Sequence, residues 1–175
     1  QMSHLQMGSA QIELNFEDLP FEQWNKVGST KIELMYKPSA QMTARPLRKI
    51  ASGGEVSRVM LACKVVLGES DVCDTLVFDE VDAGVGGATA VALAEVLAQL
   101  AKTHQVIVVT HLPQVAVMAS KQYVVSKTEE HNALPITSLT EVSGTQREEE
   151  IARMLSGSIT EASLAHAHEL LSEVR

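Results

Sequence analysis

The fold is decided by a short apolar run that ends in acids, TLVFDEVD, residues Thr75–Asp82. Its first four residues, Thr75–Phe78, favour a strand that is covered on both faces of a parallel sheet. Asp79 would then lie where the strand leaves the carboxyl edge of the sheet, the edge at which open α/β sheets bind ligands. Gly84 and the glycines that follow it require irregular backbone, so the acids lead into a tight loop.

The flanking segments extend this strand into an α/β pattern. Gln105–Thr110 predicts a second buried strand, and Thr89–Lys102 between them has apolar residues at helical spacing. A strand, helix and strand in this order predict parallel pairing of the two strands. Upstream, Ser57–Leu67 is apolar on almost every side, which is typical of a central buried helix.

Both ends of the chain predict smaller elements. Gln11–Phe16 and Lys31–Tyr36 alternate apolar with polar residues, which predicts an antiparallel pair joined near Gly28. Tyr123–Ser126 and Ile136–Leu139 predict two further strands, with a turn over residues 129–132. Two helices should close the chain. Thr145 and Glu148 are expected to cap the start of the first helix, and Gly157 to stop it. Ser158 and Glu161 are expected to cap the start of the second helix, which runs to Val174.

The fold class is therefore α/β, a mostly parallel sheet flanked by helices with a small antiparallel β portion at the N-terminus. A chain of 175 residues suits one domain with a sizeable core, and we expect residues 10–175 to form it. Residues 1–9 show no periodicity and end in Gly-Ser, so we interpret them as a linker or expression remnant.

Composition excludes several classes of protein. Hydrophobic residues make up 45% and charged residues 21% of the chain, a globular balance. No secretory leader is visible, and no apolar run reaches the roughly 20 residues of a membrane span. Cys63 and Cys73 fit neither a metal nor a disulfide spacing, which favours a reducing, cytoplasmic setting. A net charge of −8 argues against an extended surface for nucleic acid, so DNA contact would need another segment or a local patch.

The acids after the first strand are candidates for phosphate chemistry. Asp79 suits magnesium (Mg²⁺), which takes one or two carboxylates and fills its other positions with water and phosphate oxygens. The adjacent Glu80 could orient or deprotonate a water for attack on phosphorus. Taken alone, the same segment is equally well explained as a strand that ends in solvated acids.

Two further polar segments interrupt apolar elements. Ser52, Gly53, Gly54 and Glu55 precede the buried helix, and a Gly-Gly helix start with a hydroxyl suits a phosphate. Taken alone, the S-x-x-E spacing of this segment also fits an ordinary capped helix start. His111 ends the second strand, where it could donate to a phosphate oxygen, although a lone strand-end histidine commonly has no such role. The ordinary explanations do not account for all three segments meeting at one sheet edge.

This arrangement resembles the C-terminal half of the ATP-binding-cassette (ABC) ATPase head. Ser52–Glu55 resembles the signature motif, Thr75–Glu80 the Walker B motif, Val81–Gly87 the D-loop and His111 the switch histidine. More narrowly, the amino-acid sequence of these motifs is similar to that of the RecN family of bacterial DNA-repair proteins, relatives of the structural-maintenance-of-chromosomes (SMC) proteins. The segments that carry this similarity are Leu47–Lys64, Leu76–Gly87, Thr110–Ala119 and Glu150–Gly157.

The resemblance implies a composite site in which two heads sandwich two ATP molecules. It implies that Asp79 holds magnesium and that the catalytic residues are Glu80, which positions the attacking water, and His111, which senses the γ-phosphate. The implied nucleotide contacts across the interface come from the signature residues Ser52, Gly53, Gly54 and Glu55, and the implied interface residues of the D-loop are Asp82 and Gly84.

One motif of this family is absent from the sequence. No G-x-x-x-x-G-K-[ST] occurs, so the Walker A loop that cradles the β- and γ-phosphates is missing. In the family this loop belongs to an N-terminal lobe beyond a long coiled coil. The resemblance therefore implies a C-terminal lobe that is inactive alone, that joins the N-terminal lobe and a second head, and that reaches DNA through the full-length protein. It implies a cytoplasmic, nucleoid-associated protein with no membrane partner.

Three other interpretations remain open from the sequence. Ser52, Asp79 and His111 occur in the order of a hydrolase triad, although Ile50 stands where the nucleophile elbow needs its first glycine. A non-catalytic module could use the same edge only to join heads. The lobe could also belong to another ABC-type ATPase, such as a membrane transporter's cassette, whose signature more often ends in Gln than Glu.

Overall fold

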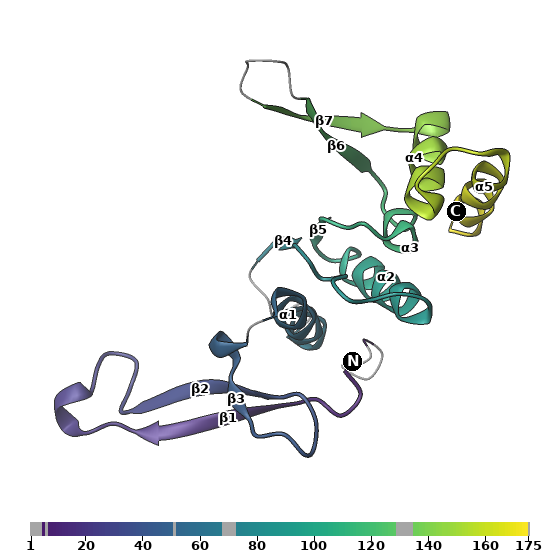
Figure 1. Ribbon diagram of the computed structural model, residues 1–175. Coiled ribbons are helices and arrows are strands. Elements are labelled where there is room, and N and C mark those ends of the chain that lie inside the picture. The colour runs from purple at the N-terminus through teal and green to yellow at the C-terminus, as the bar shows by residue number, and fades with distance from the viewer. Residues whose placement is uncertain (1–4, 6, 51, 68–72, 129–134, 175) are drawn as a thin grey trace.

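The computed structural model describes residues 5, 7–50, 52–67, 73–128 and 135–174. Its elements are stacked in layers (Figure 1). An N-terminal sheet forms one end, helices α1 and α2 lie next to it, and two short strands follow. A hairpin and two helices form the other end. The α/β class is confirmed.

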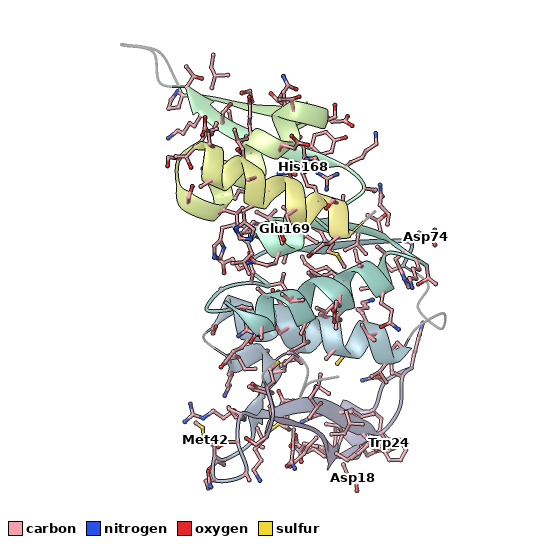
Figure 2. The ribbon with its side chains drawn as sticks, turned by 90° about the vertical axis from the view of Figure 1, so that its right-hand side faces the viewer. Asp18, Trp24, Met42, Asp74, His168 and Glu169 are labelled. Carbon is pink, nitrogen blue, oxygen red and sulfur yellow. The ribbon has the colours of Figure 1, made fainter. Side chains whose placement is uncertain are left out.

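The N-terminal sheet consists of β1 (Gln11–Asp18), β2 (Thr30–Lys37) and the two-residue β3 (Arg45–Pro46), with single-turn helices η1 (Phe21–Gln23) and η2 (Leu47–Lys49). The predicted antiparallel pair is confirmed, with Ile12 opposite Tyr36. Tyr36 is buried, but Phe16 and Ile32 farther along the pair are exposed. Trp24 lies beyond them at the outer end of the hairpin (Figure 2). Within the described chain, therefore, only the inner part of this sheet is covered.

The central layers hold α1 (Gly53–Leu67), β4 (Thr75–Phe78), α2 (Ala88–Leu100) and β5 (Gln105–Val108). β4 and β5 pair in parallel, as the sequence predicts. α2 has the buried apolar face that its spacing requires, whereas α1 does not fit its prediction. Val66 and Leu67 of α1 are exposed, so the expectation of a helix buried on all sides is wrong for the described body.

The parallel sheet is small, because β4 and β5 are its two described strands. Leu76 and Phe78 point to the covered face and are buried. On the other face Val77 and Val109 are 65% and 58% exposed. Both faces of a parallel sheet are usually buried, so the exposed apolar face of β4 and β5 is unusual.

The C-terminal layers hold α3 (Pro113–Ala116), β6 (Gln122–Thr128), β7 (Ile136–Val142), α4 (Gly144–Ser156) and α5 (Glu161–Glu173). The two predicted strands are confirmed as an antiparallel hairpin, and their predicted turn lies outside the described residues.

The predicted starts of the last two helices are wrong. α4 follows Ser143 without a side-chain cap, and α5 is capped by Thr160 in a reciprocal pair with Ser163. Gly157 ends α4 in the left-handed conformation, as expected.

An arginine that the sequence did not single out fastens α4 to the rest of the chain. Arg147 donates from Nη2 to the carbonyl oxygens of Ala116, Val117 and Ala119, and from Nε to Gln122. These carbonyls lie at the end of α3, where a helix leaves acceptors unsatisfied. The contact joins α4 to the end of α3, whose Ala116 and Val117 belong to a smaller core with side chains of α4 and α5.

The start of the chain contributes to packing. Leu5 and Met7 are 2% and 8% exposed and belong to the main core. Leaving residues 1–9 out of the fold therefore missed two core side chains, because a short segment with no periodicity gives no sequence signal of burial. The division of the chain at residue 10 is otherwise untested.

Candidate functional site

The ends of β4 and β5 meet at one edge of the sheet. Phe78 pairs with Val108, and the amide of Val109 donates to the carbonyl oxygen of Phe78 over 2.9 Å. Asp79 and Glu80 follow β4, while Thr110 and His111 follow β5. The predicted placement of the acids and the histidine on one edge is confirmed.

The start of α1 lies directly against the acidic loop. A Cβ atom on Gly53 would stand 2.6 Å from Oε2 of Glu80. A Cβ atom on Gly54 would stand 2.8 Å from the Cβ of Ala83 and 3.0 Å from the carbonyl oxygen of Glu80. Real Cβ atoms do not approach so closely, so the acidic loop can pack against the start of α1 only because glycine occupies both positions. This contact brings the signature-like segment and the Walker B-like segment together.

Two polar residues of α1 hold the backbone of that loop. Ser57 Oγ donates to the carbonyl oxygen of Asp79 over 2.8 Å. Arg58 Nη1 donates to the carbonyl oxygens of Ala83 over 2.8 Å and Val81 over 3.3 Å. Sequence reasoning missed both residues. The available signal was the presence of two polar side chains at one point of a helix that is otherwise apolar.

Glu80 has an unusual backbone conformation. Its φ is +57°, in the left-handed region that residues other than glycine rarely adopt. Such a conformation costs about 1–3 kcal/mol, and it persists only where the surroundings enforce it. Here the amide of Ala83 donates to the carbonyl oxygen of Glu80, and Gly54 lies against the same oxygen. Gly84, two residues beyond Asp82, is exposed and has a φ of +73°.

Asp82 is the buried member of the acidic segment. It is 3% exposed, and its Oδ2 accepts hydrogen bonds from the Thr110 hydroxyl and the His111 amide, while His111 Nδ1 lies 3.1 Å from the same oxygen. Its predicted position at an interface between heads stays a prediction, since these contacts lie within one chain.

The hydrolase-triad interpretation finds no support in these contacts. His111 faces Asp82 and not Asp79. Ser52 Oγ accepts from the amide of Glu55 at 3.4 Å, which is a long helix-capping contact and half of the expected capping box.

One resolved pKa shift lies next to the site. Burial raises the pKa of Tyr36, the charge of Glu55 raises it further, and the charge of Arg58 opposes them.

The acids allow a magnesium ion only together with other ligands. No group of three or more His, Cys, Asp or Glu in the described ranges could hold a metal ion. Asp79 nevertheless presents an exposed carboxylate at the sheet edge while Ser57 holds its backbone. A single carboxylate fits magnesium that is bound mainly through phosphate and water.

Two relatives of this chain carry the same name. "DNA repair protein RecN" of Streptomyces coelicolor is 47% identical over 149 residues, which cover 85% of this chain and 26% of that protein. The protein of the same name from Xylella fastidiosa is 39% identical over 180 residues, covering 99% of this chain and 31% of the relative. The chain belongs to the RecN family. It spans about a quarter to a third of the length of these RecN proteins, and no protein-family model matches it.

Solved structures support the fold. The Smc head domain of Pyrococcus yayanosii, with a coiled coil and joint, matches with a TM-score of 0.55 and 18% identity, covering 98% of this chain and 27% of that one. The Smc head domain of Pyrococcus furiosus, bound to the C-terminal domain of ScpA, matches with a TM-score of 0.53 and 20% identity. The match covers 99% of this chain and 35% of that one. This RecN-family chain therefore has the fold of part of an SMC-type head.

The two glycines of this RecN-family site should respond differently to alanine. In Gly53→Ala the added methyl meets the end of a flexible side chain, so Glu80 can move and the melting temperature should change little. In Gly54→Ala it meets Ala83 and backbone, which should cost about 1–3 kcal/mol and lower the melting temperature by several degrees. Melting followed by circular dichroism checks this. Gly86→Ala, with nothing within 4 Å, is the matched control, and equal melting of Gly54→Ala and Gly86→Ala would contradict the close approach.

Proposed function

We propose that this chain is the C-terminal lobe of the ATPase head of an SMC-like protein for repair of DNA double-strand breaks. It would complete a composite site for ATP, whose binding and hydrolysis drive head dimerisation and DNA tethering. The observation that carries the proposal is the close contact between the signature-like glycines and the acidic loop. Membership of the RecN family supports it.

Within one head, the acids at the end of β4 would act on the head's own nucleotide. Asp79 would hold Mg²⁺, which when bound with ATP neutralises charge on the phosphates. Glu80 would position and deprotonate the attacking water, and its carboxylate lies close to Gly53 at the start of α1. Hydrogen bonds from Ser57 and Arg58 hold the loop backbone and leave the acidic side chains available.

Across the dimer, the start of α1 would act on the opposite nucleotide. Ser52, Gly53 and Gly54 would bind its γ-phosphate through backbone amides and the serine hydroxyl, since a helix start is suited to an anion. The family resemblance implies that the remaining interface residues are Glu55, Asp82, Gly84 and His111.

The exposed apolar surface is consistent with a missing lobe. Val77, Ile107 and Val109 form a bare face on β4 and β5, and such a face is expected to be covered in the whole protein. We propose that the N-terminal lobe, which would carry Walker A, covers it. The relatives are three to four times as long as the segment that they share with this chain, which leaves room for that lobe.

The remaining partners follow from charge and family. A net charge of −8 supports DNA contacts elsewhere in the full-length protein, which a second copy would join through the heads. None of the helices in the described ranges has the length and apolar character to cross a bilayer. We place the full-length protein in the cytoplasm, at the nucleoid.

Binding of ATP to the separate lobes tests the proposal. By itself, this chain should show neither ATP hydrolysis nor micromolar affinity for magnesium-ATP, because it lacks the cradle for the β- and γ-phosphates. Titration calorimetry measures the affinity. Adding the N-terminal lobe as a separate chain should restore both binding and turnover, and tight binding by this chain alone would contradict the split head.

A further inference from the structure

The contacts of Asp82 suggest a role that differs from nucleotide contact. Its side chain is 4% exposed, while the side chain of His111 is 69% exposed. The amide of His111 donates to Asp82 Oδ2 over 3.0 Å, and His111 Nδ1 lies 3.1 Å from the same oxygen. A buried carboxylate therefore binds the backbone amide of an exposed histidine and lies next to Nδ1 of its ring.

Thr110 extends this network on the other side. Its hydroxyl donates to Asp82 Oδ2 and accepts from the amide of Leu112 over 3.0 Å. An ionised carboxylate can only accept, so the single hydroxyl proton is donated to Asp82 and a lone pair of the hydroxyl accepts from Leu112. One hydroxyl group thus links the Asp82 carboxylate to the Leu112 amide, just after the end of β5.

These contacts fix how the imidazole can act. An ionised carboxylate only accepts hydrogen bonds, so the 3.1 Å approach of Nδ1 to Asp82 Oδ2 favours the tautomer that carries its proton on Nδ1. Nε2 is then the ring nitrogen left for an outside partner. A carboxylate that holds Nδ1 of a histidine sets both its tautomer and its orientation, and it stabilises the ring when the ring is positively charged.

We infer that Asp82, supported by the Thr110 hydroxyl, is a positioning residue that orients His111 toward the γ-phosphate through Nε2. Asp82 would act on ATP hydrolysis through the histidine and not by touching the nucleotide. The inference rests on the proposed function, and it gives Asp82 a different role from the interface contact that the family resemblance implies.

A double-mutant cycle in the full-length protein tests the inference. The variants are His111→Ala, Asp82→Asn and the double variant, each measured for kcat and KM of ATP hydrolysis. His111→Ala should lower kcat by about 100-fold, the lower end for loss of a group that transfers or donates a proton. Asp82→Asn should lower kcat by about 10- to 100-fold with KM little changed, the range for loss of an orienting partner. The double variant should be no slower than His111→Ala.

A matched pair at Thr110 keeps the inference testable if Asp82→Asn does not fold. Thr110→Val removes the hydroxyl and should lower kcat, whereas Thr110→Ser keeps it and should stay near the wild-type rate. In the His111→Ala background, Thr110→Val and Thr110→Ser should give the same low kcat. A difference between them in that background, or multiplying effects of Asp82→Asn and His111→Ala, would overturn the inference.

The proposed function can fail separately. Glu80→Gln with wild-type turnover would reject the catalytic function itself. If Glu80→Gln is inactive while Asp82→Asn or His111→Ala keeps the wild-type kcat, then only the positioning role is rejected.

Discussion

Glu80→Gln in the full-length protein should block ATP hydrolysis and leave ATP binding intact. The amide keeps the size of the side chain beside Gly53 but cannot take a proton, and loss of a general base typically costs about 10²- to 10⁴-fold in rate. Asp79 remains in place to hold magnesium, so the heads should accumulate as an ATP-dependent dimer. Phosphate release measures the turnover, and sedimentation with ATP measures the dimer.

The control for this variant is the same chemical change on the exposed surface of α2. Glu95→Gln should turn over ATP at the wild-type rate. Unchanged turnover in Glu80→Gln would favour the module that joins heads without catalysis.

Ser52→Arg should leave each head able to bind ATP and unable to engage a second head. Ser52 is exposed at the start of α1, where an arginine side chain would fill the space proposed for the opposite γ-phosphate. Turnover should fall as far as in Glu80→Gln, but without a trapped dimer. Ser120→Arg places the same side chain on an exposed loop and is the control.

Mixing Ser52→Arg with Glu80→Gln distinguishes action within a head from action across the dimer. In a mixed dimer, one composite site keeps both intact motifs and the other carries both lesions. Partial turnover should therefore reappear. If every ratio is inactive and sedimentation shows no ATP-dependent mixed dimer, then Ser52–Glu55 is only a capped helix start. Inactive mixed dimers that do form with ATP would indicate that the two sites are strictly coupled.

The sequence predicted the site edge well because its signals are local. Short β-branched runs located β4 and β5, and parallel pairing alone brings Asp79 and His111 to the same edge. Contacts between distant residues could not be predicted in this way. Asp82 and Thr110 are 28 residues apart in the chain, and nothing in their spacing indicates a hydrogen bond.

Helix starts and burial were predicted less well for a physical reason. Thr145 and Glu148 have the capping-box spacing, yet α4 begins at Gly144, which has a positive φ, so the helix starts two residues earlier than a cap at Thr145 predicts. Leu5 is buried by tertiary packing that no local pattern reveals. Periodicity reports which side of a helix is apolar, and it does not report whether the partner for that side belongs to the same chain.

The contact between Gly53 and Glu80 has a consequence for two nucleotides at once. Under the proposed arrangement the glycine reads the γ-phosphate on the opposite head while the glutamate works on its own. If the start of α1 shifts when it binds the opposite γ-phosphate, the shift would move the Glu80 carboxylate that acts on the head's own ATP. Coupling of this kind is reciprocal for binding. The two ATP molecules of a dimer would then bind cooperatively. Gly53 would transmit this cooperativity, because it has no flexible side chain between the helix start and Glu80.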